Sequence, residues 1–107
     1  MTRLSPDAPK SVTDDGRTVS IDVHGCSREE ALRLIRQCVV LASARARDRV
    51  EVIHGIGGVI EQGLRSALSS GGLSGVTGSV TLSGRTVISL PLSGNPDRRR
   101  IGVSDLV

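Results

Sequence analysis

In the stretch Ile21-Asp22-Val23-His24-Gly25, a β-branched run ends in a histidine and a glycine just before a helix-like segment. The same order returns in Ile53-His54-Gly55-Ile56-Gly57-Gly58. A strand, a crossover helix and the next strand of one sheet run parallel in nearly all cases, so both strands end at the same edge. We therefore expect Asp22, His24 and His54 to converge at that edge, where open α/β sheets bind their ligands.

The segments around the first stretch alternate between strand and helix patterns. Residues 18–24 place Val19, Ile21 and Val23 on one face and Ser20, Asp22 and His24 on the other, as in a half-buried strand. Ser27 and Glu30 have the spacing of a capping box that starts a helix. The core-facing stripe of that helix is predicted to hold Ala31, Leu34, Ile35, Cys38, Leu41 and Ala42.

The second half of the chain repeats this alternation and then changes to paired strands. Residues 50–54 predict a strand and residues 59–69 a second helix. Two apolar stretches, 76–82 and 86–90, flank Ser83-Gly84-Arg85, which suits a hairpin turn. The predicted order is βαβαββ in one α/β domain over residues 18–92. Residues 1–17 are predicted to be a mobile leader and residues 93–107 a polar C-terminal tail.

The composition limits the partners that the domain can bind. The chain contains no Phe, Tyr or Trp, which excludes base stacking on aromatic rings. The net charge is +3 and Lys10 is the only lysine among 14 basic residues. This arginine excess fits a polyanionic partner, or it reflects a GC-rich genome. Without a membrane-length apolar run, a secretory signal or cysteines at a metal-finger spacing, we expect a cytoplasmic protein with reduced thiols.

The two strand ends carry residues that suit phosphodiester chemistry. Histidine serves as general acid or base near neutral pH, and Asp22 shares a strand face with His24 and is placed to orient its ring. Gly25, Gly55, Gly57 and Gly58 precede helix starts, where a phosphate can approach free backbone N–H groups. Arg45, Arg47 and Arg49 form an arginine-rich corner, interpreted either as phosphate contacts or as a solvated face. The alternatives are two structural histidines, or a less favoured zinc site of His24, Cys26 and His54.

The two stretches, with Cys26-Ser27-Arg28-Glu29-Glu30-Ala31 after the first, resemble the paired signatures of the small MutS-related (Smr) domain. The resemblance covers residues 18–90. It implies a two-layer α/β sandwich with a mixed four-stranded sheet and two helices, similar to the C-terminal domain of translation initiation factor 3. It also implies that Asp22 and His24 are the residues tied to cleavage, and that residues 54–57 form the phosphate-binding loop. The chain departs from the family at Ile56, where many members have a basic residue, and its glycine loop is one residue shorter.

The predicted function is a nucleic-acid endonuclease that cleaves RNA or nicks DNA with Asp22, His24 and His54. Two chemistries fit these residues, namely cleavage aided by a divalent metal ion and metal-free attack by an RNA 2′-hydroxyl. The alternatives are a non-catalytic domain that binds nucleic acid or the ribosome, and a protein-interaction domain. The sequence specifies neither the metal requirement nor the oligomeric state.

Overall fold

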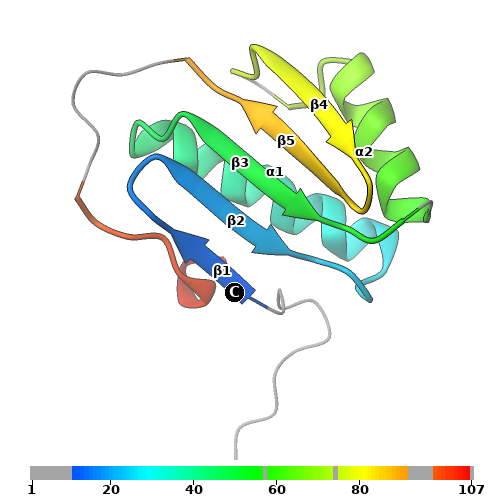
Figure 1. The fold of residues 1–107 in the computed structure, drawn as a ribbon, viewed down its shortest axis with the longest axis horizontal. Helices are drawn as coiled ribbons and strands as arrows, with labels where there is room; N and C mark the ends of the chain where they lie inside the picture. The colour runs from blue at the N-terminus through cyan, green and yellow to red at the C-terminus, as the bar shows by residue number, and fades with distance from the viewer. Residues whose placement is uncertain (1–10, 57, 74, 92–97, 107) are drawn as a thin grey trace, which may run out of the picture.

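A mixed sheet with two helices on one of its faces forms the described part of the chain, residues 11–56, 58–73, 75–91 and 98–106 of the computed structural model (Figure 1). The strands and helices are, in chain order, β1 (Ser11–Asp14), β2 (Thr18–Asp22), α1 (Arg28–Ala44), β3 (Arg49–Ile53), α2 (Val59–Ser69), β4 (Gly78–Leu82) and β5 (Arg85–Ser89), and a short 3-10 turn, Val103–Asp105, follows them. The sheet order is β1-β2-β3-β5-β4. The strands β2 and β3 are parallel, as predicted, and the other pairs are antiparallel.

The sheet has five strands within the described residues, whereas the sequence predicted four. The additional strand, β1, lies inside the segment that was predicted to be a mobile leader, and it pairs with β2 from Ser11 opposite Asp22 to Asp14 opposite Val19. As an edge strand with a single neighbour, β1 contains only one apolar residue, Val12, and therefore lacks a hydrophobic alternation that would reveal it. Residues 1–10 lie outside the described residues.

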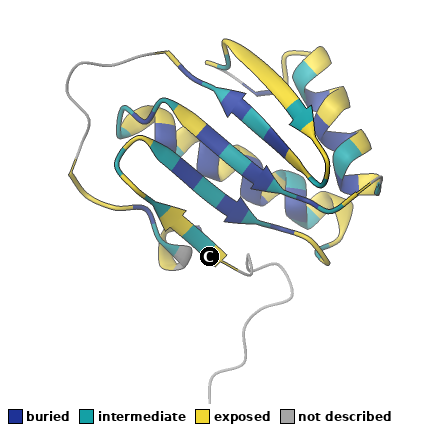
Figure 2. Cartoon of the chain, in the orientation of Figure 1, coloured by how far each residue is buried: buried dark blue, intermediate teal, exposed yellow. Residues whose placement is uncertain are grey.

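The core lies between the sheet and the helices, and it is made of aliphatic side chains. Figure 2 shows buried positions alternating along β2, β3 and β5 with positions that are mostly of intermediate exposure, so that one face of each strand meets the helices. Val19, Ile21 and Val23 are fully buried, as the alternation predicted. On α1 the buried stripe is the predicted one except that Val39 is buried and Leu41 is half-buried. Burial raises the pKa of the Cys38 thiol to about 12, so this thiol stays protonated at neutral pH.

Helix α1 begins and ends in well-defined caps. The Ser27 hydroxyl accepts a hydrogen bond from the Glu30 backbone N–H at 3.2 Å, which confirms this half of the predicted capping box. At the other end Ala46 has a left-handed backbone with φ of 58°. The Ala46 and Arg47 amides donate back to the carbonyls of Ser43 and Ala42, the hydrogen bonds of a left-handed C-terminal cap. This cap reverses the chain and directs Arg47 into the protein.

Arg47 joins both ends of the described chain to the sheet. Its fully buried guanidinium donates to the Asp14 carboxylate at 2.8 and 3.0 Å and to the Arg99 carbonyl at 2.7 Å. The other Asp14 contacts include the Ile101 backbone N–H, at 2.8 Å. Ile101 and Leu106 are buried in the core, so this part of the predicted polar tail is packed against the domain. None of the helices within the described ranges is long and apolar enough to span a membrane.

Candidate functional site

The candidate site lies at the carboxyl edge of the parallel pair β2 and β3. Asp22 and Ile53 are register partners at the ends of these strands, and the Val23 N–H donates to the Ile53 carbonyl at 2.9 Å. Both strands therefore end at one edge, as expected. The two helices cover one face of the sheet (Figure 1). Asp22 and Ile53 each follow a fully buried residue, Ile21 and Val52, and are themselves only partly buried, so strand alternation places them on the face that carries no helix.

Asp22 and His24 form a hydrogen-bonded pair at this edge. The Asp22 Oδ1 accepts both the His24 backbone N–H at 3.1 Å and the ring Nδ1 at 2.5 Å. An ionised carboxylate only accepts hydrogen bonds, so Nδ1 carries the hydrogen and Nε2 presents its lone pair. The His24 side chain is 50% exposed and the Asp22 side chain 18%. The arrangement is that of an oriented imidazole whose second nitrogen is open to a ligand.

His54 lies at the same edge but on the other face of the sheet. It is 4% exposed, and its Nδ1 is 2.7 Å from the Gly55 carbonyl oxygen while its Nε2 is 2.9 Å from the Thr86 hydroxyl. A carbonyl only accepts, so Nδ1 donates and Nε2 accepts from Thr86. Both ring nitrogens of His54 therefore have protein partners, and the expected convergence of His54 with Asp22 and His24 is not observed. Strand alternation explains the difference, because His54 follows the buried positions Val50 and Val52, whereas His24 follows Ser20 and Asp22.

Some of the glycines that were predicted to bind phosphate make structural contacts. The amides of His54 and Gly55 both donate to the Gly84 carbonyl at 3.0 Å, which fastens this loop to the turn between β4 and β5. Gly25 turns the chain from β2 towards α1 with φ of +85°. Gly58 is the N-cap of α2 and makes no side-chain cap hydrogen bond. Gly57, also predicted to bind phosphate, lies outside the described residues.

The arginine-rich corner lies at the far end of the parallel strands. Arg49 begins β3, whereas the histidines follow the ends of β2 and β3. Arg47 is fully buried against Asp14, and Arg45 donates to the Arg100 carbonyl at 3.1 Å and lies 3.7 Å from Asp105. Only Arg49 of the three is exposed. The structure thus places these three residues at the opposite end of the strands from the Asp22–His24 pair, and two of them hold the C-terminal segment in place.

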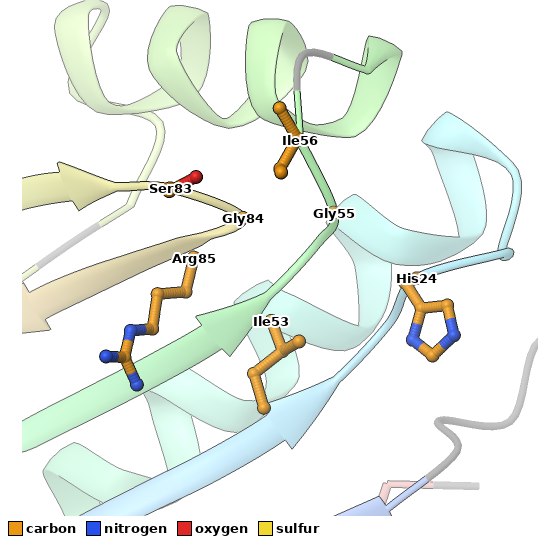
Figure 3. Close-up of a pocket in the computed structure, with 7 residues that line it drawn as sticks. All are labelled: His24, Ile53, Gly55, Ile56, Ser83, Gly84 and Arg85. Carbon is orange, nitrogen blue, oxygen red and sulfur yellow. The ribbon is translucent and has the colours of Figure 1, made fainter.

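A shallow hollow of about 410 Å³ adjoins His24. Figure 3 shows its lining, which comes from the loop after β2, the end of β3 with its following loop, and the hairpin of β4 and β5: His24, Ile53, Gly55, Ile56, Ser83, Gly84 and Arg85. Arg85 was not among the residues predicted for the site. The signal that could have placed it there is the short hairpin turn, because β5 runs antiparallel to β3 and so starts, at Arg85, opposite Ile53.

Arg85, which lines this hollow, forms an ion pair with Glu51. Its Nη1 atom lies 3.2 Å from Glu51 Oε2, and its side chain is 51% exposed. Within the ranges that the structure covers, no group of three or more His, Cys, Asp and Glu side chains is arranged to hold a metal ion. The alternative zinc site of His24, Cys26 and His54 is not formed, because the ring nitrogens of His54 are bound elsewhere.

The fold and the site define a small α/β domain with an oriented, exposed histidine at the carboxyl edge of its parallel strands. The family model of the Smr domain matches residues 21–77, just over half of the chain. The chain therefore belongs to the Smr domain family, which is known for nuclease-related or nucleic-acid-binding roles.

A solved structure supports the same assignment. The chain is similar to the crystal structure of the Smr domain of Thermus thermophilus MutS2, with a TM-score of 0.61 and 26% identity. The match covers 67% of this chain and 96% of the other. A comparison with curated proteins gave no match.

Proposed function

We propose that this domain is a nucleic-acid endonuclease whose chemical centre is the Asp22–His24 pair. The observation that carries the proposal is the hydrogen bond from His24 Nδ1 to Asp22, which leaves Nε2 without a protein partner among the described residues. Histidine with an orienting carboxylate is an arrangement that serves general base catalysis. The membership of the Smr family agrees with a substrate that is a nucleic acid.

In the proposed reaction His24 Nε2 takes the proton of the attacking hydroxyl, either an RNA 2′-hydroxyl or water. The hydroxyl oxygen forms a bond to phosphorus, and the bond between phosphorus and the leaving oxygen breaks with its electron pair. The leaving oxygen then takes a proton from water. Asp22 holds the imidazole in the required tautomer and stabilises the imidazolium that forms. Arg85 lines the same hollow, and its positive charge would attract the phosphate.

His54 has a positioning role in this proposal. Through Gly55 and Thr86 it ties the loop after β3 to β5, and so it fixes the hollow in which Arg85 lies. Because its Nε2 already accepts from Thr86, His54 is not assigned a proton-transfer step.

Cleavage of a labelled single-stranded RNA by the purified chain tests this function. We expect wild type to cleave, and His24→Ala to lose at least about 10²-fold in rate, the contribution of a general base. Arg36→Ala is the control, because Arg36 is exposed on α1, in the layer behind the sheet, and should leave the rate unchanged. Parallel reactions with chelator, with divalent ions and with a 2′-deoxy strand distinguish attack by the 2′-hydroxyl from hydrolysis.

Wild type that leaves RNA and DNA intact in all of these reactions would contradict the proposed endonuclease. Binding without cleavage would instead support a non-catalytic domain that recognises nucleic acid or the ribosome.

A further inference from the structure

The hollow beside His24 is mainly apolar, which is unexpected for a surface that meets only phosphates. Ile53 and Ile56 contribute its aliphatic side chains, and the backbones of Gly55 and Gly84 contribute much of the rest. Of the large apolar side chains that the structure describes, Ile56 is the most exposed, at 81%. An apolar side chain so exposed beside a reactive histidine marks a surface that a ligand would cover.

The glycine backbone leaves room for a flat group to approach. A Cβ built at Gly55, where φ is +85°, would meet no heavy atom within 4 Å outside its chain neighbours, so the space above this residue is open. A Cβ at Gly84 would lie 3.6 Å from Ile56 Cγ1, which shows how closely the hairpin turn packs against the Ile56 side chain. The hollow is therefore bounded by aliphatic groups and a bare backbone surface.

Arg85 is the lining residue with a planar polar group. Its side chain is 51% exposed, and its guanidinium pairs with Glu51 at 3.2 Å. A guanidinium stacks on a nucleobase or donates two parallel hydrogen bonds to it. Because the chain contains no Phe, Tyr or Trp and His24 is assigned to the chemistry, Arg85 and the two isoleucines are the lining groups left to hold a base by its face or edge.

We propose that the hollow binds the nucleobase next to the scissile phosphate, so that the substrate is an unpaired nucleotide. A base inside a duplex is stacked and paired and does not enter a hollow in a protein surface unless it is extruded. Ile53 and Ile56 cover one face of the base, and Arg85 contacts it from the rim. This inference rests on the proposed function for the position of the phosphate, but base binding itself is measured without cleavage.

Fluorescence anisotropy with three labelled probes tests the proposal: a single-stranded RNA, the same strand annealed to its complement, and a strand of equal length made of abasic nucleotides. We expect wild type to bind the single strand at least about tenfold more tightly than the other two probes. Ile56→Ala should lose most of this preference. Val40→Ala is the matched control, because Val40 is 66% exposed on α1 and lies outside the hollow.

A second variant, Arg85→Lys, keeps the positive charge and removes the planar guanidinium group. It should lower the preference for the base-bearing strand while binding to the abasic strand stays within about twofold. Equal affinity of wild type for the single-stranded and abasic probes, or equal behaviour of Ile56→Ala and Val40→Ala, would overturn the proposal. Selective binding of the single strand by a chain that cleaves nothing would support the base site and contradict the endonuclease, so the two failures are distinguishable.

Discussion

His24 and His54 follow neighbouring strands, yet their surroundings give them different chemistry. His24 has one ring nitrogen bound to Asp22 and is half exposed, whereas His54 is enclosed between the Gly55 carbonyl and the Thr86 hydroxyl. The Thr86 hydroxyl is also 3.1 Å from the Thr81 hydroxyl. Since Thr86 donates to His54, Thr81 donates to Thr86, and a chain of hydrogen bonds crosses β4 and β5 to reach the loop after β3.

Thr86→Val should destabilise the domain by about 1–3 kcal/mol. Valine matches the shape of threonine but leaves the buried Nε2 of His54 without a donor, and an unsatisfied buried polar atom carries a cost of this size. Denaturant unfolding of wild type and variant measures the difference. The control, Thr13→Val, changes an exposed side chain on β1 and should stay within about 0.5 kcal/mol. Equal stability of the two variants would show that the hydrogen bond to His54 contributes nothing.

The sequence contained enough information to separate the two histidines. His24 continues the polar face of Ser20 and Asp22, and His54 continues the apolar face of Val50 and Val52. Strand alternation is enough to place them on opposite faces, but the prediction of one shared site followed the matching His-Gly order instead. The burial of Arg47 was not predictable in the same way, because its partner Asp14 lies in a strand that the local sequence does not reveal.

At the scale of elements, short-range signals account for most of what the sequence predicted. The Ser27 cap, the bounds of α2 and the hairpin of β4 and β5 follow from local patterns, and the structure confirms them. The α1 stripe is confirmed apart from Leu41, which is half-buried, and Val39, which is buried but was not predicted. The strand β1 depends instead on pairing with β2 and on the contact of Asp14 with Arg47, which are remote in sequence. Contacts between residues that are remote in sequence produce no periodic pattern of apolar residues within the strand itself.

The end of α1 provides a sharp test of backbone conformation. Ala46 has φ of 58°, a left-handed conformation that costs roughly 1–2 kcal/mol for an L-residue other than glycine. We predict that Ala46→Gly raises the free energy of unfolding by about 1 kcal/mol. The matched control is Ala44→Gly, in the last helical residue, where glycine should lower stability by about 0.5–1 kcal/mol. Thermal or denaturant unfolding measures the change in the free energy of unfolding for each variant. Changes of the same sign in the two variants would contradict the left-handed cap at Ala46.

At the scale of the whole molecule, one ion pair holds three remote parts together. Asp14 lies in β1, Arg47 follows α1, and the Arg99 carbonyl and Ile101 amide belong to the C-terminal segment. Burial alone would raise the pKa of Asp14, but hydrogen bonds from Arg47, Ile101 and Gly16 outweigh it and lower the pKa. The folded domain therefore favours the ionised carboxylate.

A lowered pKa fixes the sign of the pH dependence. The stability contributed by Asp14 is fully present above its usual pKa of about 4 and is lost as pH falls through the folded-state value. We predict that Asp14→Asn destabilises the domain by roughly 3–5 kcal/mol at neutral pH, because Arg47 stays buried without its partner. The variant should also lose less stability than wild type on acidification below about pH 4.

Asp48→Asn is the control for that experiment. Asp48 pairs with Arg17, whose side chain is 80% exposed, so its loss should cost less than about 1 kcal/mol. Equal costs for Asp14→Asn and Asp48→Asn, measured by denaturant unfolding across pH, would contradict the role given to the buried pair.

We propose that the Asp22–His24 pair, and not His54, performs the chemistry. The measurement that separates the two is the single-turnover cleavage rate of Asp22→Ala and of Thr86→Val, each compared with wild type at a temperature where all three are folded. We expect Asp22→Ala to lose at least about tenfold in rate with little change in melting temperature, because His24 loses its orienting partner. Thr86→Val should melt at a lower temperature and keep the rate per folded molecule within a few fold. A wild-type rate for Asp22→Ala together with a collapse for Thr86→Val would contradict it.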